Sequence, residues 1–280
     1  MSSGYKLYDY DPSVGAAVVF AGLFAATSVL HLFQMIRKRT WYFVPFIVGG
    51  FFETFGYIAR YYSAKQTPNW TVMPYVGQEL LLLLAPSLFS ASIYMILGRI
   101  IRLVHGDSRS LIGPSWLTKI FVTGDVLSFF IQSGGGGMMA SAKSASSVSL
   151  GNKIIVIGLI VQLVFFGFFI IVSMVFHLRM RSSPTPTSLA ISPPWYTYMR
   201  VLYAASVFVM VRSVYRVVEY VQGTDGVLQQ HEVYLYVFDA VLMLLCCLLF
   251  NVMHPSRILS SRQPYGKMDG DQVEMLNSGR

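Results

Sequence analysis

Long apolar stretches separated by short polar segments dominate this sequence. Each stretch reaches the roughly 20 residues that an α-helix needs to cross a hydrocarbon core about 30 Å thick. The intervening segments hold the Pro, Gly, Ser and charged residues typical of loops. The pattern predicts an all-α, polytopic membrane protein, a bundle of seven transmembrane helices with spans at about 13–36, 42–63, 74–98, 116–140, 152–177, 196–221 and 231–253.

Composition supports lipid as the main solvent of the chain. Hydrophobic residues make up 54% of the 280 residues and charged residues only 12%, whereas soluble domains carry about 25% charged residues. The net charge of +8 does not indicate nucleic-acid binding, because the basic residues form short clusters beside the apolar stretches. Such clusters are typical of loops that flank membrane helices.

The distribution of Lys and Arg predicts the orientation. Twelve basic residues fall on the side of the 37–39 loop and of the C-terminus, and three or four on the other side. The positive-inside rule therefore predicts an external N-terminal segment over 1–12, a membrane domain over 13–256 and a disordered cytosolic tail over 257–280. The glycosylation sequon Asn69-Trp70-Thr71 falls on the predicted outer side.

Charged residues nevertheless occur inside the predicted spans, as in "VMVRSVYRVVEYVQG" over 209–223. A charge at the bilayer centre costs about 2.5–3.5 kcal/mol on insertion scales, so these residues must face the bundle interior. At about 100° per residue, Arg212, Arg216 and Glu219 share one helical face. Glu53 and Arg60 share another. We expect the first face to form the cationic wall of a polar cavity open towards the outer leaflet.

Acids outnumber arginines at these depths. Arg60, Arg212 and Arg216 face a larger set of carboxylates, namely Glu53, Glu79, Asp125, Glu219 and Asp239. A network of buried ion pairs that only holds the helices in register would need no such excess. A surplus carboxylate must be protonated, solvated or matched by an external cation. The pattern therefore favours a functional cavity, while the purely structural network stays open as an alternative.

Two further features concern the helix backbone. The run "QSGGGGMM" over 132–139 indicates either a frayed helix end or a bare backbone that a neighbouring helix approaches closely. It is not a phosphate-binding loop, because no lysine follows with the required spacing. Pro86, inside the third predicted span, should kink that helix and free a backbone carbonyl.

Other classes of seven-helix protein fit less well. A retinal protein needs a lysine in the last span, which has none, and a bis-histidine haem protein needs paired histidines at matching depth, whereas His31, His177 and His254 lie at predicted cytosolic ends. No zinc-hydrolase motif occurs, and the adjacent Cys246 and Cys247 fit simple packing. No cofactor and no metal site is expected. A lipid-sensing receptor, a porphyrin- or haem-handling protein and an intramembrane lipid hydrolase stay open.

Several motifs resemble those of the fungal RTA-like family, the lipid-translocating exporters named for resistance to aminocholesterol. The resemblance runs in order from about residue 10 to residue 255. Its motifs are "ETFGYIAR" (53–60), "QELLLLLAPSLFSASIYMILGRII" (78–101), "GDVLSFFIQSGGGGMM" (124–139), "RSVYRVVEYVQGTDGVLQQHEVYLYVFD" (212–239) and "FNVMHP" (250–255).

The resemblance implies a multi-pass plasma-membrane protein of fungi. Family members are linked to translocation of sphingoid long-chain bases, to sterol-analogue and drug resistance, and in some cases to porphyrin handling. The expected function is therefore translocation of amphipathic lipids or sterol-like drugs rather than catalysis, with the lipid hydrolase still open as an alternative and without nucleic acid as a partner. The matched positions expected to bind the ligand are Glu53, Arg60, Gln78, Glu79, Asp125, Gln132, Arg212, Arg216, Glu219, Glu232 and Asp239, with Glu53, Asp125 and Glu79 expected to receive its amine.

Overall fold

A computed structural model describes residues 8, 10–142, 144–191, 194–223 and 226–256 of the chain. The described residues form helices and connecting turns, with no β-strand among them. The predicted tail over 257–280 lies outside the described residues, as do residues 1–7.

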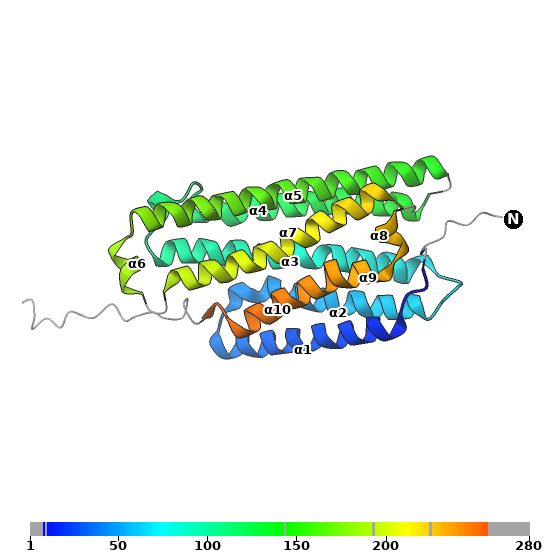
Figure 1. Cartoon of the computed structure of the whole chain (residues 1–280), viewed down its shortest axis with the longest axis horizontal. Helices are drawn as coiled ribbons and strands as arrows, with labels where there is room; N and C mark the ends of the chain where they lie inside the picture. The colour runs from blue at the N-terminus through cyan, green and yellow to red at the C-terminus, as the bar shows by residue number, and fades with distance from the viewer. Residues whose placement is uncertain (1–7, 9, 143, 192–193, 224–225, 257–280) are drawn as a thin grey trace, which may run out of the picture.

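Long helices lie side by side in one elongated bundle (Figure 1). The last of them is composite: a short α-helix, a π-helix and a longer α-helix follow one another without a loop. The long helices are α1 (Val14–Lys38), α2 (Val44–Ala64), α3 (Val72–Leu103), α4 (Pro114–Ala140), α5 (Ala145–Ser182), α7 (Trp195–Gln222) and the composite of α9 (Glu232–Leu235), the π-helix Tyr236–Val241 and α10 (Leu242–Val252). The shorter elements are α6 (Pro186–Ala190), α8 (Val227–Gln230) and the 3-10 turns Trp41–Phe43 and Asp107–Arg109.

Each of the seven predicted segments is helical, but several helices extend past their predicted ends. The helix α5 begins at Ala145, inside a segment predicted to be a loop, because the Ser144 side chain accepts a hydrogen bond from the backbone N–H of Ser147 and caps the helix. Polar residues at a helix end therefore marked the predicted edge of the membrane rather than the end of the helix.

Six of these helices are long and apolar enough to cross a membrane, which confirms an all-α, polytopic membrane protein. They are α1, α2, α3, α5, α7 and the composite last helix. The helix α4 is 27 residues long but less apolar, since it contains Lys119, Asp125, Gln132 and a run of four glycines. A seventh crossing by α4 and the orientation of the termini stay predictions.

The helix α3 forms the centre of the bundle. Figure 1 places α1 and α2 on one side of it and α4 and α5 on the other, and α3 also contacts α7. In α3 72% of the most apolar window is buried, compared with 28% in α1. The lipid-facing surface therefore belongs mainly to the outer helices, whereas residues of α3 face neighbouring helices on nearly every side.

Glycines set the closest helix contacts on both sides of α3. A methyl group at Gly56 of α2 would lie 2.6 Å from the Leu82 side chain of α3, and one at Gly135 of α4 would lie 2.7 Å from the Gly151 carbonyl of α5. The helix α4 continues through its glycine run to Ala140, so the expectation of a frayed end is wrong and that of close approach holds at Gly135.

The seventh crossing can be tested with single cysteines on either side of α4. If α4 spans the membrane, Ser146→Cys reacts with an impermeant maleimide on intact cells, and Ser108→Cys reacts only after permeabilisation. Both serines are exposed. The native Cys246 and Cys247 are buried, so the unmodified protein is the matched background. Labelling of both variants from the same side would show that α4 does not cross.

Candidate functional site

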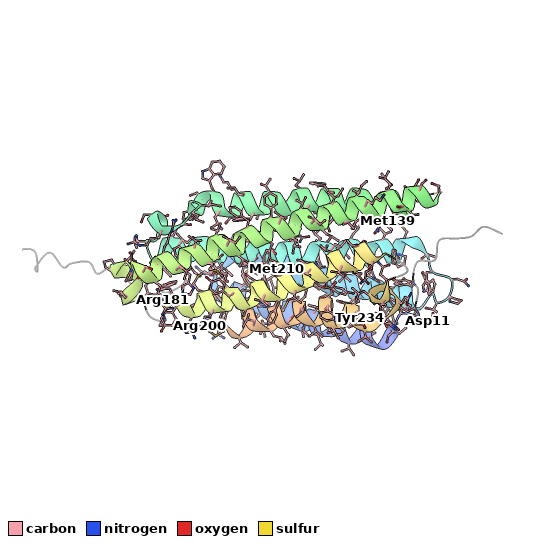
Figure 2. The ribbon with its side chains drawn as sticks, turned by 45° about the horizontal axis from the view of Figure 1, so that its top comes forward. Asp11, Met139, Arg181, Arg200, Met210 and Tyr234 are labelled. Carbon is pink, nitrogen blue, oxygen red and sulfur yellow. The ribbon has the colours of Figure 1, made fainter. Side chains whose placement is uncertain are left out.

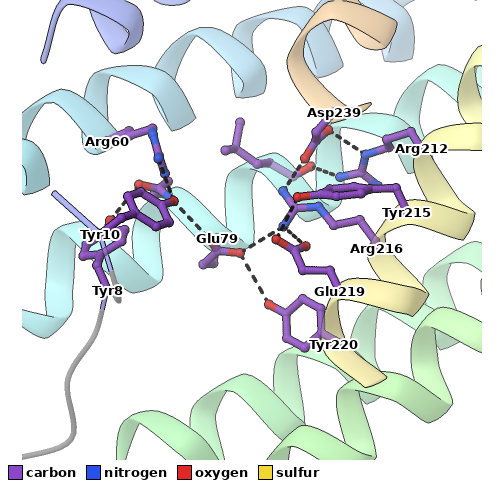
Figure 3. Close-up of polar contacts among 12 residues, drawn as sticks. Tyr8, Tyr10, Arg60, Glu79, Arg212, Tyr215, Arg216, Glu219, Tyr220 and Asp239 are labelled. Atoms are coloured by element: carbon purple, nitrogen blue, oxygen red, sulfur yellow. Dashed lines mark hydrogen bonds and ion pairs between the residues drawn. The ribbon is translucent and has the colours of Figure 1, made fainter. Parts of the chain in front are cut away.

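A buried carboxylate shared by two arginines forms the centre of the polar network (Figure 3). Arg212 donates from Nε to Oδ1 of Asp239 over 2.8 Å, and Arg216 donates from Nη2 to Oδ2. The three side chains are each 1% exposed. Arg212, Arg216 and Glu219 all lie on the buried face of α7, as the helical spacing predicted.

The opposing carboxylate comes from an irregular part of the last helix. Asp239 belongs to the π-helix Tyr236–Val241, which joins α9 to α10. A π-helix closes its hydrogen bonds over five residues instead of four, so its turn is wider than that of an α-helix. Both oxygens of Asp239 thereby reach one arginine each on α7.

Pro86 provides a third partner for the same arginine. Proline has no N–H, so the Leu82 carbonyl, four residues earlier in α3, lacks its usual helical donor. Arg212 donates from Nη2 to that carbonyl over 2.8 Å. The freed carbonyl predicted from Pro86 is therefore confirmed, and it joins α3 to the ion pair between α7 and the last helix.

The network continues from Arg216 towards the end of the bundle that holds the α2–α3 turn. Arg216 Nη1 lies 3.1 Å from Glu219 Oε2 and 3.6 Å from Glu79 Oε2. Tyr215 donates to Glu219 over 3.0 Å, and Gln78 donates to Glu79 over 2.9 Å. Two acids therefore share the second arginine with Asp239.

Arg60 forms a second cluster on the neighbouring side. Its Nη2 lies 2.6 Å from Glu232 Oε1 and donates to the Tyr10 hydroxyl over 2.9 Å, while its Nε donates to the Tyr236 hydroxyl over 3.1 Å. The guanidinium carbon also lies 5.7 Å from the Tyr10 ring centre and 5.4 Å from that of Tyr236. Glu232 in turn accepts hydrogen bonds from the Ser13 backbone N–H.

The segment before α1 packs over this end of the network. Tyr8 donates to Gln78 Oε1 over 2.9 Å, its hydroxyl oxygen lies 3.0 Å from Ser63 Oγ, and it is only 5% exposed. Burial raises the pKa of Tyr8 and of Tyr10 above the ordinary value, although Arg60 opposes both shifts, so the two phenols stay neutral. The expected cavity open to the outside is therefore wrong for this conformation, because the two tyrosines cover Arg60 and Gln78.

Glu53 stands apart from these pairs. It lies on α2, its side chain is fully buried, and neither carboxylate oxygen has a hydrogen-bond partner among the described residues. Asp239, Arg212 and Arg216 are the charged groups that act on it most strongly, yet none of them forms an ion pair with it. The surplus carboxylate anticipated from the sequence is present at this position.

Asp125 and Gln132 lie away from the arginines, at the contacts of α4 with its neighbours. Gln132 donates to Ser128 Oγ over 3.0 Å and to Gln162 Oε1 over 3.2 Å. Asp125 is 3% exposed and faces Tyr94 of α3. Of the eleven predicted site residues, the three arginines and six others thus lie on α3 or on one side of it, and Asp125 and Gln132 belong to a different group.

The tyrosines of this site are not among the binding residues predicted from the sequence. Tyr8 and Tyr10 lie in the predicted external segment, and Tyr215 and Tyr236 lie within predicted spans. Their spacing relative to charged neighbours was a usable signal, since Tyr215 and Glu219 are four apart on one helix.

Histidines and cysteines form no metal site in the described part of the chain, where no group of three or more His, Cys, Asp or Glu side chains is arranged to hold an ion. His31 instead hydrogen-bonds to the Cys247 carbonyl at 3.0 Å, inside the bundle. His31 is 1% exposed, so its side chain is packed between helices. Cys246 and Cys247 are free and buried in the core.

Residues 46–262 match the family model described as RTA1 like protein. The chain belongs to this family. Among its relatives in Saccharomyces cerevisiae, Protein RTA1 is 36% identical over 277 residues, which cover 90% of this chain and 86% of the relative. Protoporphyrin uptake protein 1 is 36% identical over 285 residues, with 89% and 92% covered.

A more distant relative is named as a lipid transporter. Sphingoid long-chain base transporter RSB1 of Saccharomyces cerevisiae is 26% identical over 266 residues, which cover 83% of this chain and 69% of the relative. No solved structure matches the chain. The matched region covers α3, α4, α5, α7 and the composite last helix in full and α2 from its third residue onward, and it does not include α1.

The shared Asp239 predicts the cost of removing either arginine. Arg212→Leu and Arg216→Leu each leave a buried carboxylate short of a partner, which should lower the free energy of unfolding by about 3–5 kcal/mol. Thermal unfolding of the purified protein in detergent should show a clear fall in Tm. Arg200→Leu is the matched control on the same helix, because Arg200 is exposed at its first turns (Figure 2) and should cost at most about 0.5 kcal/mol. Equal Tm values for all three variants would show that Asp239 needs neither arginine.

Proposed function

We propose that this protein translocates amphipathic lipids across the membrane, with the fungal plasma membrane as its location and the arginine–acid network as its headgroup site. Membership of the RTA1-like family supports this assignment, as does the name of the relative that is a sphingoid long-chain base transporter. The network supports it further, because a bundle that only needed rigidity would be more stable with apolar residues in place of buried charges.

The preferred ligand is a lipid with a cationic amine, such as a sphingoid long-chain base. Glu53 is the observation that carries this preference: it is a fully buried carboxylate with two unpartnered oxygens. An ionised carboxylate without a partner is costly in a low-dielectric interior, and an ammonium group would remove that cost. The arginines cannot do so, because Asp239, Glu219, Glu79 and Glu232 already engage them.

Unpartnered donors near Glu53 fit the hydroxyl groups of such a lipid. The Tyr57 hydroxyl, Arg60 Nη1 and Arg216 Nε are buried, and none has a hydrogen-bond partner among the described residues. Tyr57 lies one helical turn from Glu53, and Arg60 lies about one turn further along α2. A headgroup that carries one amine and a neighbouring hydroxyl would therefore satisfy the Glu53 carboxylate and the Tyr57 hydroxyl together, with Arg60 about 10 Å away from Glu53 along α2.

Access to this site requires a change of conformation. Tyr8 and Tyr10 cover the network at one end, and Glu53 is closed off by packed side chains. Release of the N-terminal segment would open the headgroup site while the alkyl chain stays among the lipid-facing helices. The described conformation then corresponds to the closed state of the transport cycle.

Porphyrin transport is the second candidate, because one relative is named Protoporphyrin uptake protein 1. A porphyrin would present carboxylates to Arg60, Arg212 and Arg216. These arginines already have carboxylate partners, so the site favours a cation over an anion. An acidic ligand would first have to displace one of those partners.

The amine preference is tested by binding of a long-chain base and its N-acetylated, neutral analogue to the purified protein. Wild type should bind the charged base at least tenfold more tightly, since one charge-assisted contact contributes about 1.5–3 kcal/mol. Glu53→Gln should fold normally and lose that difference. Asp11→Asn removes an exposed acid (Figure 2) and is the control for non-specific attraction of cations.

Equal affinity of wild type for the two analogues would contradict the assignment of Glu53. Tighter binding of protoporphyrin than of the charged base would show that the arginines, rather than Glu53, bind the polar part of the ligand. Transport itself is measured by the rate at which a fluorescent long-chain base changes leaflet in liposomes that contain the protein. Conversion of that base to a product of different mass would identify an enzyme instead.

A further inference from the structure

A second buried acid lies on the other side of α3. Asp125 is in the middle of α4, is 3% exposed, and has no ion pair or hydrogen bond of good geometry within the described part of the chain. A charged carboxylate in such surroundings would cost several kcal/mol, so the neutral acid is the form that this conformation accommodates.

The groups around Asp125 contribute no positive charge. From α3, the Tyr94 hydroxyl faces it, with Ser90 beside Tyr94. From α5, aromatic packing comes close, since a methyl group at Gly124 would lie 2.6 Å from Phe165 Cγ. Tyr94 is thus the titratable neighbour, and no Lys, Arg or His of the described residues pairs with the acid.

Polar side chains extend from Asp125 along the α3–α4–α5 contacts. Ser128, one turn further along α4, donates to the Gly158 carbonyl of α5 and accepts from Gln132 over 3.0 Å. Gln132 also donates to Gln162 over 3.2 Å, and Gln162 donates to Ser87 of α3 over 3.1 Å. These groups lie between Asp125 and the end of α4 marked by Met139 in Figure 2, and they could solvate water that enters when the helices separate.

The helix α3 connects the polar side chains near Asp125 to the headgroup site. On α3, the Leu82 carbonyl accepts from Arg212, and Ser87, five residues later, accepts from Gln162. Pro86 lies between them and removes one backbone hydrogen bond of α3 at that point. A movement of α3 at Pro86 would therefore change both polar groups at once.

We propose that Asp125 is a proton-binding site whose protonation and deprotonation drive the translocation proposed above. In the closed state Asp125 holds one proton on a carboxyl oxygen. When α3, α4 and α5 separate, that proton leaves to water along the polar side chains, and Asp125 is reprotonated from the opposite side. The cationic lipid and one proton cross in opposite directions, so the net charge moved is zero.

The proton itself can be observed without any lipid substrate. Infrared difference spectra of wild type against Asp125→Asn, recorded at pH 7 in lipid, should contain the C=O stretch of a protonated carboxylic acid, shifted in D₂O. Asp125→Glu, which keeps the acid, should retain such a band. Glu232→Gln is the matched control, because Glu232 is ion-paired with Arg60 and should contribute only carboxylate bands.

Carboxylate bands in place of the carboxylic-acid band would overturn the proton site. If Asp125→Asn failed to fold, the comparison of wild type with Asp125→Glu would replace it. A shift in the frequency of the carboxylic-acid band between these two proteins would assign the band to residue 125. Wild type and Asp125→Glu with superimposable carboxylic-acid regions would refute it. This measurement does not depend on whether the protein transports lipid.

The coupling of proton movement to lipid movement rests on the proposed function. It is tested in liposomes with a fluorescent, N-trimethylated long-chain base, which cannot carry a proton itself. With one proton exchanged per lipid, a gradient of one pH unit sustains about a tenfold leaflet asymmetry, since that unit corresponds to about 1.36 kcal/mol. Asp125→Asn should equilibrate the probe without asymmetry. Equal leaflet asymmetry with wild type and with Asp125→Asn would refute the coupling. So would a wild type that moves the probe without producing any asymmetry. A wild type that moves no probe at all would instead refute lipid translocation.

Discussion

One buried carboxylate between two arginines is the interaction on which the rest of the bundle depends. Asp239 neutralises only part of the charge of Arg212 and Arg216, so both arginines need further acceptors away from water. The Leu82 carbonyl supplies one of these, and Glu219 and Glu79 supply the others. Three elements, α3, α7 and the composite last helix, are thereby held at fixed rotation about their axes, because a charge with no partner in the interior is far more costly than a poorly packed apolar side chain.

This arrangement divides the protein into two chemically different sides that share α3 as a wall. On the side of α2, α7 and the last helix, charged groups form ion pairs with one another, and the Glu53 carboxylate has no partner among the described residues. On the side of α4 and α5, hydroxyl and amide groups hydrogen-bond to one another, and the Asp125 carboxyl group has no partner among the described residues. A structural network alone would have no reason to keep two unpaired acids at these depths, so each is the natural place to look for an exchangeable cation.

Much of the fold follows from the sequence because hydrophobic length is a local property. The seven helical segments could be located from apolar runs, and the inward face of α7 from the spacing of Arg212, Arg216 and Glu219. The choice of partners could not be predicted, since the sequence places Asp239, Glu79 and other carboxylates within reach of the same arginines and does not rank them. Pairing depends on how neighbouring helices rotate, and for Asp239 it depends on a π-helix that has no clear sequence pattern. The role of Tyr8 was hidden because a polar segment outside the spans gives no sign of folding back.

The π-helix also constrains how this region of the gene can evolve. A π-turn is equivalent to one residue inserted into an α-helix, and an insertion displaces everything beyond it by about 100° around the axis. Loss of a single residue from Tyr236–Val241 would restore a regular helix but would turn either Asp239 or the apolar face of α10 away from α7. The length of this helix is therefore more tightly constrained by the structure than most of its side chains: a one-codon deletion should disrupt the fold more severely than conservative substitutions along the helix.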